Sequence, residues 1–338
     1  MDQIGLSINT RGETSDEELI SIAQHADEQG YHSFWAAESW GRDAFTVLTM
    51  IACHTQNLRL ATGIVNVFSR TPALIAQTIA SLDILSNGRA ILGLGSSGKV
   101  VVEGWHGVPF DSPLARTREY IEIIRKALSG APVNHQGKFY QMDRFRMISP
   151  PAQERLPIYI ASLGPKNLSL TGEVADGWLP TWVNRERLPD LMEQISLGAA
   201  KSGRNISDVT IAPYLMCYTA DGPEDLAHGE QLLRAHMAYY IGGMGTFYFE
   251  SFSRAGFTTE AQAIRDAWSS KNRDQAAAAV TDQMLESVAV LGDVKQCQDQ
   301  LAKFRRAGFD IPIVTFPHGM GLDAIRRTIS ALAPRAGA

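Results

Sequence analysis

Cysteine is scarce in this chain, and the few cysteines that occur are widely spaced. Cys53, Cys217 and Cys297 are the only ones among 338 residues, and no two of them form a C-x-x-C pair. This spacing argues against a disulfide framework and against a thiolate zinc site. The eight histidines include no H-E-x-x-H motif, and His228 and His236 would lie two helical turns apart, too far for one ion. The sequence therefore predicts no bound metal.

Clustered positive charge and long apolar runs are also lacking. No run of Lys and Arg reaches four residues and the net charge is -5, which leaves no electrostatic footprint for a nucleic-acid backbone. No apolar stretch approaches the roughly 18 residues of a membrane span, and the start MDQIGLSINT lacks the parts of a signal peptide. We expect a cytoplasmic protein that acts on a small-molecule substrate and binds neither nucleic acid nor membranes.

What the chain does contain is a regular alternation of short apolar runs and helical segments. Hydrophobic residues make up 45% and charged residues 20%, as in a large buried core with a polar surface. The alternation indicates repeated βα units, and eight predicted strands suggest a (β/α)8 TIM barrel in a single domain over residues 1–338. The expected strands are Ile4–Asn9, His32–Glu38, Leu58–Val65, Ala90–Gly95, Pro157–Ser162, Gly177–Trp182, Val209–Tyr218 and Ile311–Phe316.

Two stretches interrupt this alternation. A short hairpin is predicted around Lys138–Phe145, and a helical insertion at about 221–309 separates the seventh and eighth strands. The most apolar and aromatic part of the insertion is Tyr239–Phe252, which contains three glycines. If these glycines give mobility, the segment is a lid or a dimer contact, and the alternative is ordinary helix packing.

A glycine-rich segment, Gly93–Gly98, directly follows the fourth strand and has the form G-x-G-x-x-G. A dinucleotide fingerprint belongs at the first strand of a βαβ unit and must open a helix at once, whereas the next clear helix is expected only near Pro113. In a barrel, the same glycines would let backbone N–H groups and the hydroxyl of Ser96 or Ser97 approach an anion. The other interpretation is a tight turn without a ligand.

The fifth strand leads into a comparable segment. Ser162, Leu163 and Gly164 precede Pro165, a residue favoured at the first position of a helix. The first turn of that helix offers unpaired N–H groups to an anion. Two neighbouring strand ends are therefore predicted to bind an anionic group.

Glu38 stands between two tryptophans at the end of the second strand, where barrel enzymes keep their catalytic groups. Apolar surroundings would keep this carboxyl group protonated and let it act as a general acid, or it could anchor a ligand ring. The alternative is an exposed glutamate that caps the following helix. Trp40, and Trp182 at the end of the sixth strand, are candidate walls of a substrate pocket, or core residues.

Several of these segments resemble the luciferase-like monooxygenase superfamily, in particular its coenzyme F420-dependent oxidoreductases related to methylenetetrahydromethanopterin reductase. The resemblance covers nearly the whole chain. Its most specific parts are Leu92–Gly98, Glu103–Phe110, Leu163–Leu168 and Gly172–Pro180. The tail Val290–Phe316 also follows the family pattern.

The resemblance implies a homodimeric barrel with a deazaflavin ring across the strand ends. It also implies a non-prolyl cis peptide behind the ring, which falls on Gly63–Ile64 and is followed by Val65. The residues expected to receive the cofactor phosphate are Gly95, Ser96, Ser97, Gly98, Ser162, Leu163 and Gly164.

The sequence departs from its relatives at two positions. Relatives often have Asp-His at the end of the second strand, and this chain has Glu38 and Ser39, so proton donation by an imidazole cannot be carried over. Sugar-phosphate-oxidising relatives place a glutamate after the strand 4 glycines, where this chain has Gly98 and Lys99. A glucose-6-phosphate substrate is therefore not expected.

The leading hypothesis is an F420-dependent oxidoreductase that moves a hydride between the deazaflavin C5 and a small organic substrate, with Glu38 as the catalytic residue. One alternative is an FMN-dependent luciferase-like monooxygenase. Another is a non-catalytic flavin-binding barrel. Tetrahydromethanopterin derivatives, enones, imines, alcohols and aldehydes all remain open as substrates.

Overall fold

The computed structural model describes residues 2–8 and 14–334, so the predicted strand residue Asn9 lies outside the described part of the chain. These residues form two compact units. The N-terminal unit takes its residues from Gly5–Leu179 and Met192–Thr210. The C-terminal unit takes its residues from Met1–Ile4, Pro180–Leu191 and Ile211–Ala338.

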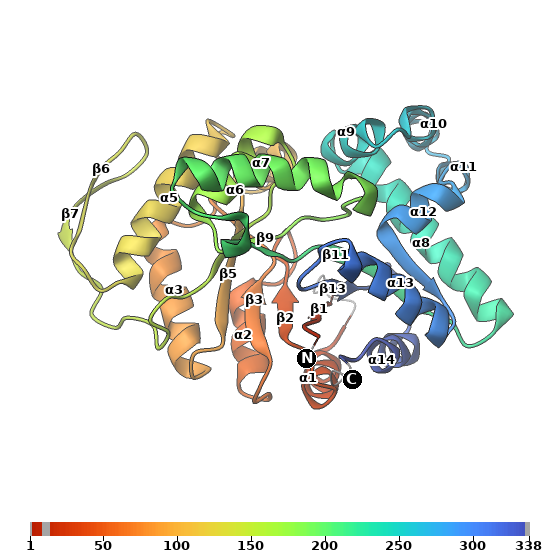
Figure 1. Cartoon of the computed structure of the whole chain (residues 1–338), viewed down its shortest axis with the longest axis horizontal. Coiled ribbons are helices and arrows are strands. Elements are labelled where there is room, and N and C mark those ends of the chain that lie inside the picture. Colours follow the sequence, from red (N-terminus) through yellow and green to blue (C-terminus); the bar gives the residue numbers. More distant parts are fainter. Residues whose placement is uncertain (1, 9–13, 335–338) are drawn as a thin grey trace. The chain divides into compact units, whose positions relative to one another are not determined.

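In the N-terminal unit, parallel strands lie side by side in the order in which they occur along the chain. That order is β1-β2-β3-β5-β8-β9, and β4 runs along the end of β5. The strands are β1 (Gly5–Ser7), β2 (Ser33–Ala36), β3 (Arg59–Thr62), β4 (Val65–Asn66), β5 (Ala90–Gly95), β8 (Ile158–Ile160) and β9 (Gly177–Trp178). Helices connect successive parallel strands (Figure 1), so the unit is built from the predicted βα repeats.

The helices of this unit begin where the sequence offers caps. Ser15 accepts the N–H of Glu18 at 3.2 Å, and the Glu18 carboxylate accepts the N–H of Ser15 at 2.8 Å, as a capping box requires. Asp43 and Thr71 cap the next two helices through their side chains. The helices are α1 (Asp16–Glu28), α2 (Ala44–Ala52), α3 (Pro72–Leu85), α4 (Lys99–Gly104), α5 (Pro113–Leu128), α6 (Pro165–Val174) and α7 (Leu188–Lys201), of which α7 belongs to this unit from Met192 on.

The segment after Gly98 is a helix, contrary to the expectation of none before Pro113. Lys99–Gly104 forms α4 although three successive valines have a low intrinsic helix propensity. Val102 is fully buried, so packing outweighs propensity at this place. The glycine motif does open a helix, but it lies too late in the chain for the fingerprint of a dinucleotide fold, which follows the first strand.

Most strands are shorter than predicted. Strand β3 ends at Thr62, just before the cis peptide, and the predicted seventh strand is split into β10 (Thr210–Ile211) and β11 (Tyr214–Thr219). Pro213 lies at this split, and a proline has no N–H to give to a sheet.

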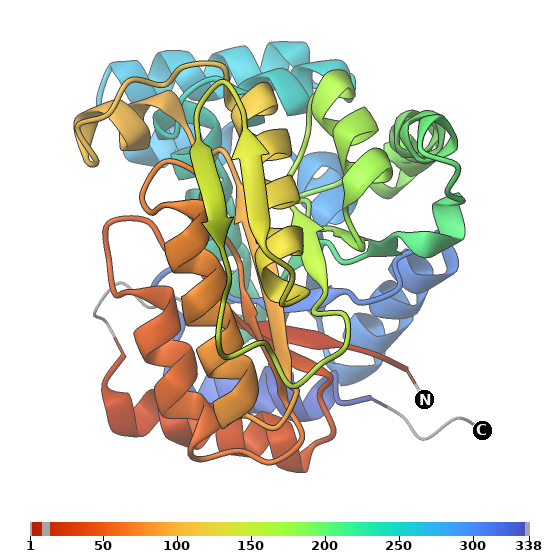
Figure 2. The ribbon, with the colours of Figure 1, turned by 90° about the vertical axis from the view of Figure 1, so that its left-hand side faces the viewer.

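The predicted hairpin is present beside α5 (Figure 2) and pairs β6 (Val133–Gln136) with β7 (Gln141–Phe145). The buried carboxylate of Glu119 in α5 accepts the backbone N–H groups of Phe139 and Tyr140 at 3.1 and 2.7 Å. Burial opposes ionisation of Glu119, but these hydrogen bonds hold its pKa below the usual value. The hairpin is therefore fixed to α5 by a buried charge.

The C-terminal unit contains three parallel strands in the order β13-β11-β12. Strand β12 (Ala289–Gly292) lies inside the insertion that was predicted to consist of several helices, so a short strand was missed there. The only sign of this strand in the sequence is the presence of residues with high β propensity, such as Val290. The other elements are β13 (Ile313–Thr315), α8 (Pro223–Gly243), α9 (Phe247–Arg254), α10 (Thr258–Ser269), α11 (Arg273–Ala278), α12 (Asp282–Val288), α13 (Val294–Arg306) and α14 (Leu322–Ala331).

Two glycines of the aromatic segment Tyr239–Phe252 serve helix packing. A Cβ atom at Gly242 would lie 2.6 Å from the Trp268 side chain, and one at Gly243 would lie 3.0 Å from it. Helix α8 can approach α10 this closely only without side chains at these positions. The structure thus favours packing over mobility for this pair.

The described part of the chain contains no group of three or more His, Cys, Asp or Glu residues that could hold a metal ion. Its three cysteines are free thiols. None of the helices between residues 14 and 334 is long and apolar enough to cross a membrane.

Stability is expected to fall as the pH drops, because of His32 before strand β2. Burial, and then the charge of Arg59, lower the pKa of His32 from 6.5 to about 4. The unfolded chain therefore binds an extra proton between these values, and the stability present above pH 6.5 is lost as the pH falls towards 4. We expect a loss of roughly 2 kcal/mol, allowing for partial exposure of the ring.

Urea unfolding at pH 7.5 and pH 4.5 measures this effect. The His32→Gln variant should show a smaller difference between the two pH values. His54→Gln, at the exposed end of α2, is the control and should keep the wild-type difference. An unchanged pH dependence in His32→Gln would contradict the assignment.

Candidate cofactor and substrate site

Four loops of the N-terminal unit leave the carboxyl ends of neighbouring parallel strands. They contain all the predicted site residues except Trp182, and they follow β2, β3, β5 and β8. Since these strands are paired in one parallel sheet, the loops emerge at one edge. The loop residues are Glu38 and Trp40, then Gly63, Ile64 and Val65, then Ser96, Ser97 and Gly98 after Gly95, and Ser162, Leu163 and Gly164.

The predicted cis peptide between Gly63 and Ile64 is confirmed. The N–H of Gly63 donates to the carbonyl of Ala36 at 2.7 Å, and the N–H of Glu38 donates to the carbonyl of Ile64 at 3.3 Å. Val65 then returns to the sheet as part of β4, along β5. The two residues between β3 and β4, Gly63 and Ile64, are called the bulge below, and these hydrogen bonds tie it to β2.

The three glycines of the G-x-G-x-x-G segment have three different surroundings. A Cβ at Gly93 would lie 1.9 Å from the carbonyl oxygen of Thr62, so this glycine allows β3 and β5 to approach. A Cβ at Gly95 would lie 3.2 Å from the Ile64 side chain, next to the bulge. A Cβ at Gly98 would meet nothing within 4 Å. Only Gly98 therefore faces open space.

Helix N-termini begin at two of these loops without side-chain caps. Gly98 precedes α4 and Gly164 precedes α6, and neither residue supplies a cap hydrogen bond. The first N–H groups of a helix have no partner within it, and they favour an anion. Helix α6 is the longer of the two, with ten residues, so its N-terminus is the better candidate for an anion site. Ser97 has a φ of +57°, a left-handed conformation that is uncommon outside glycine and often found at functional sites.

Side-chain groups near α6 are only partly available to a ligand. The buried hydroxyl of Ser162 lies 2.8 Å from that of Thr171, and the Ser162 carbonyl accepts the indole N–H of Trp178. The side-chain oxygen of Asn167, in the first turn of α6, is buried and has no hydrogen-bond partner. A ligand at this loop would therefore meet backbone donors and one unsatisfied side-chain acceptor.

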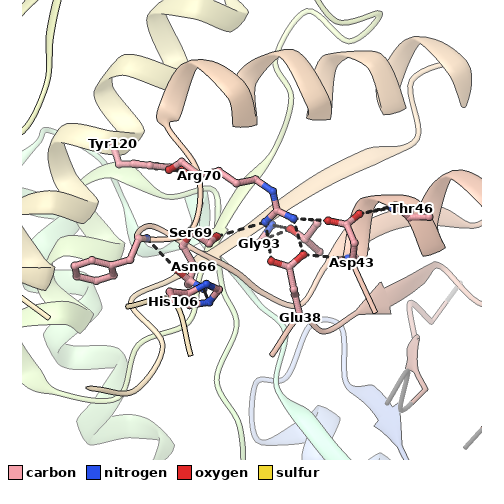
Figure 3. A network of polar contacts seen from close by, with 12 residues as sticks. Glu38, Asp43, Thr46, Asn66, Ser69, Arg70, Gly93, His106 and Tyr120 are labelled. Atoms are coloured by element: carbon pink, nitrogen blue, oxygen red, sulfur yellow. Dashed lines mark hydrogen bonds and ion pairs between the residues drawn. The ribbon is translucent and has the colours of Figure 1, made fainter. Parts of the chain in front are cut away.

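Glu38 does not stand among apolar side chains as its sequence neighbours predicted. Its carboxylate is paired with Arg70, with Nη1–Oε1 2.6 Å and Nη2–Oε2 2.9 Å (Figure 3). It also accepts the N–H of Ala44, the first residue of α2, at 3.1 Å. The expected apolar surroundings are thus corrected to a bidentate pair with a guanidinium. The alternative interpretation, in which Glu38 caps the following helix, is partly right because Glu38 accepts the N–H of Ala44.

Sequence reasoning missed the partners of Glu38. Arg70 follows β4 and also pairs with Asp43, the N-cap residue of α2. Burial alone would raise the pKa of Asp43, but hydrogen bonds from Thr46 and the charge of Arg70 lower it. Asn66, in β4, contacts His106 at 3.0 Å (Figure 3). No motif links these residues, since each pair is joined by tertiary folding.

The two tryptophans lie in different units. Trp40 is 41% exposed in the loop after β2 of the N-terminal unit. Trp182, in the C-terminal unit, is 4% exposed and its ring centre lies 4.9 Å from Tyr240 and 5.1 Å from Tyr248. Burial raises the pKa of Tyr248. Trp182 has a φ of +56°, which is unusual for a bulky residue and indicates a position fixed by its surroundings.

Comparison with known proteins finds similarity over most of the chain. The luciferase-like monooxygenase family model matches residues 4–310. A Mycobacterium tuberculosis protein with the provisional name coenzyme F420-dependent oxidoreductase is 32% identical over 93% of this chain and 94% of its own. The 5,10-methylenetetrahydromethanopterin reductase of Methanolobus tindarius is 30% identical over 89% and 90%.

A solved structure extends the likeness to the fold. The coenzyme F420-dependent tetrahydromethanopterin reductase from Methanopyrus kandleri matches with a TM-score of 0.85 and 25% identity, covering 98% of this chain and 97% of that one. This match confirms the predicted α/β-barrel fold class. The chain therefore belongs to the luciferase-like monooxygenase family.

Proposed function

We propose that this protein is an F420-dependent oxidoreductase that transfers a hydride between the deazaflavin C5 and a small organic substrate. The observation that carries the proposal is the pair of glycine-capped helix N-termini, at Gly98 and Gly164, at neighbouring strand ends. The sequence relatives described above, whose names refer to F420 or to methylenetetrahydromethanopterin reduction, support the choice of cofactor.

The residues at these strand ends fit a phosphate-bearing cofactor. The N–H groups at the start of α6 would receive the phosphate, and the free space beside Gly98 and Gly164 admits it without a side chain in the way. The unsatisfied oxygen of Asn167 would accept a hydroxyl of the cofactor. When bound, F420 supplies a carbon centre that accepts or releases a hydride. Gly63, Ile64 and Val65 would support the ring.

Glu38 is the proposed catalytic residue, and Trp40 is a proposed wall of the substrate pocket. Glu38 is 11% exposed and held next to the bulge through its backbone N–H. A carboxylate in this place would orient the substrate, and the exposed indole of Trp40 would cover it. Trp182 remains a proposed pocket residue from its position in the sequence after strand β9.

Isotope transfer tests the proposed reaction. The protein is incubated with F420 and a panel of deuterated alcohols, amines and saturated carbonyl compounds, and the cofactor is analysed by mass spectrometry. A mass increase of the reduced cofactor by one deuterium is the expected result for a substrate. F420 that becomes reduced without deuterium would contradict direct hydride transfer.

We further infer that the protein forms a homodimer through the outer face of α3. Leu74, Ile84 and Leu85 on this helix are 47%, 46% and 52% exposed. The only charged residue of α3 is Asp83, which is fully buried. In a twofold dimer the same face meets its own copy, and an uncharged apolar face does so without placing like charges opposite each other. A second copy of this chain is therefore the partner that fits.

Charged residues on this face should separate the dimer. Leu74→Arg combined with Leu85→Lys is expected to give a monomer in size-exclusion chromatography with light scattering, at protein concentrations where the wild type is a dimer. Ile148→Lys is the matched control, because Ile148 is 94% exposed outside α3. A wild type that is monomeric at all concentrations, or a double variant that stays dimeric, would contradict the assignment.

A further inference from the structure

The carboxylate of Glu38 is held in one orientation by three hydrogen bonds. Oε1 accepts from Nη1 of Arg70, and Oε2 accepts both from Nη2 of Arg70 and from the N–H of Ala44. An ionised carboxylate offers about four acceptor positions, two on each oxygen. Both positions of Oε2 are thus occupied, and Oε1 keeps one for another donor. The 11% exposure of the side chain leaves it accessible to a ligand.

Arg70 is kept in place by contacts other than Glu38. Its carbonyl accepts the hydroxyl of Tyr120 at 3.1 Å, and its guanidinium pairs with Asp43 (Figure 3). The guanidinium also lies 5.5 Å from the ring centre of Phe45. A guanidinium stays protonated in proteins, so Arg70 keeps its charge when Glu38 is changed. Arg70 should therefore remain positioned when Glu38 is changed.

The two carboxylates paired with Arg70 differ in their surroundings. Asp43 is 41% exposed, and its Oδ1 accepts the N–H and the hydroxyl of Thr46 in α2. Glu38 is less exposed, and its N–H is bonded to the carbonyl of Ile64 in the bulge. Both carboxylates thus contact the start of α2, but only Glu38 is also tied through its backbone to the loop at the end of β3.

We propose that Arg70 is a positioning residue, which fixes Glu38 as a hydrogen-bond acceptor for an O–H or N–H group of the bound substrate. This inference rests on the proposed function, because it assigns a substrate to the same strand ends. The pairing fixes the orientation of the carboxylate, and its free position on Oε1 then faces the donor. A substrate with only a carbonyl or ether oxygen at this point would be disfavoured, since two acceptors would meet.

Chemical rescue with formate tests the positioning without a substrate. Glu38→Ala removes the carboxylate but leaves Arg70 and the N–H of Ala44, so sodium formate can take the vacated place. We expect formate at about ten times its Kd to raise the Tm of this variant by about 2 °C relative to sodium chloride of equal ionic strength. The Glu38→Ala/Arg70→Gln variant should show no such shift. Equal Tm values of Glu38→Ala in formate and chloride would overturn the proposal.

Turnover then distinguishes positioning from a structural role. Arg70→Gln is expected to lower kcat by about tenfold or more while the Kd for F420 changes less than about twofold, and Arg70→Lys should fall between this variant and the wild type. Formate should restore part of the turnover of Glu38→Ala. The control is Arg118→Gln, which removes the Arg118 pairing with Glu173. Its kcat should be unchanged.

The outcomes separate this inference from the proposed function. If the wild type does not bind F420, the proposed function fails. If the wild type binds F420 and turns over a substrate, but Arg70→Gln keeps kcat within twofold, only the role of Arg70 is overturned. If F420 binds and no substrate of the panel reacts, the formate measurement alone decides whether Arg70 holds a carboxylate in this place.

Discussion

The Gly164→Asp variant should fold normally and lose its cofactor. Gly164 is the N-cap of α6, with an extended backbone, and a Cβ there would meet nothing within 4 Å. Aspartate is preferred over glycine at this position of a helix, by a few tenths of a kcal/mol. The same carboxylate would stand where a phosphate is proposed to bind. Repulsion between two charges at a distance of about 4 Å should weaken binding by about 100-fold or more.

A fluorescence titration with F420, combined with thermal unfolding, measures both effects. Gly164→Asn is the control, because asparagine also caps helices but carries no charge, and it should reduce binding much less than aspartate. An Asp variant that binds F420 like the wild type would contradict the phosphate site at α6. Lower stability together with lost binding would instead indicate damage to the fold.

The Gly93→Ala variant is expected to lose the fold. The added Cβ would lie 1.9 Å from the backbone oxygen of Thr62, and backbone cannot move aside as a flexible side chain can. The hydroxyl of Thr62 also donates to the carbonyl of Gly93 and accepts its N–H, both at 2.8 Å, so a shift would break two buried hydrogen bonds. We expect destabilisation of about 3 kcal/mol or more.

Gly98→Ala supplies the comparison within the same motif. Its Cβ would lie in open space and the only cost is the weaker N-cap preference of alanine, so urea unfolding should give a stability within about 1 kcal/mol of the wild type. If Gly93→Ala were as stable as Gly98→Ala, the close approach of β3 and β5 would be wrong. Together the two variants separate the structural glycine of the motif from the glycine at the proposed ligand site.

Local patterns predicted the elements whose causes are local. The limits of β5 were predicted at Ala90–Gly95, as found, and the hairpin predicted around Lys138–Phe145 is present. Helix α4 was missed because burial of Val102 outweighs the low helix propensity of its neighbours. Propensity is local, whereas burial depends on the whole fold.

The sequence predicted where the candidate site lies in the fold, but it did not predict the contacts of Glu38. The order of strands placed Glu38, Gly98 and Gly164 at strand ends, because parallel strands share one edge. The apolar neighbours of Glu38 in the sequence suggested an uncharged carboxyl group, but its contacts come from Arg70, 32 residues away. Sequence neighbours of a residue in a strand-end loop need not be its neighbours in space.

The measurement that tests the account most directly is a titration of the wild-type protein with F420 and, separately, with FMN, at equal ionic strength and followed by cofactor fluorescence. The account predicts saturable binding of F420, weakened about 100-fold or more by Gly164→Asp, and no comparable binding of FMN. Tight binding of FMN with oxygen uptake by the reduced flavin, and no binding of F420, would contradict it.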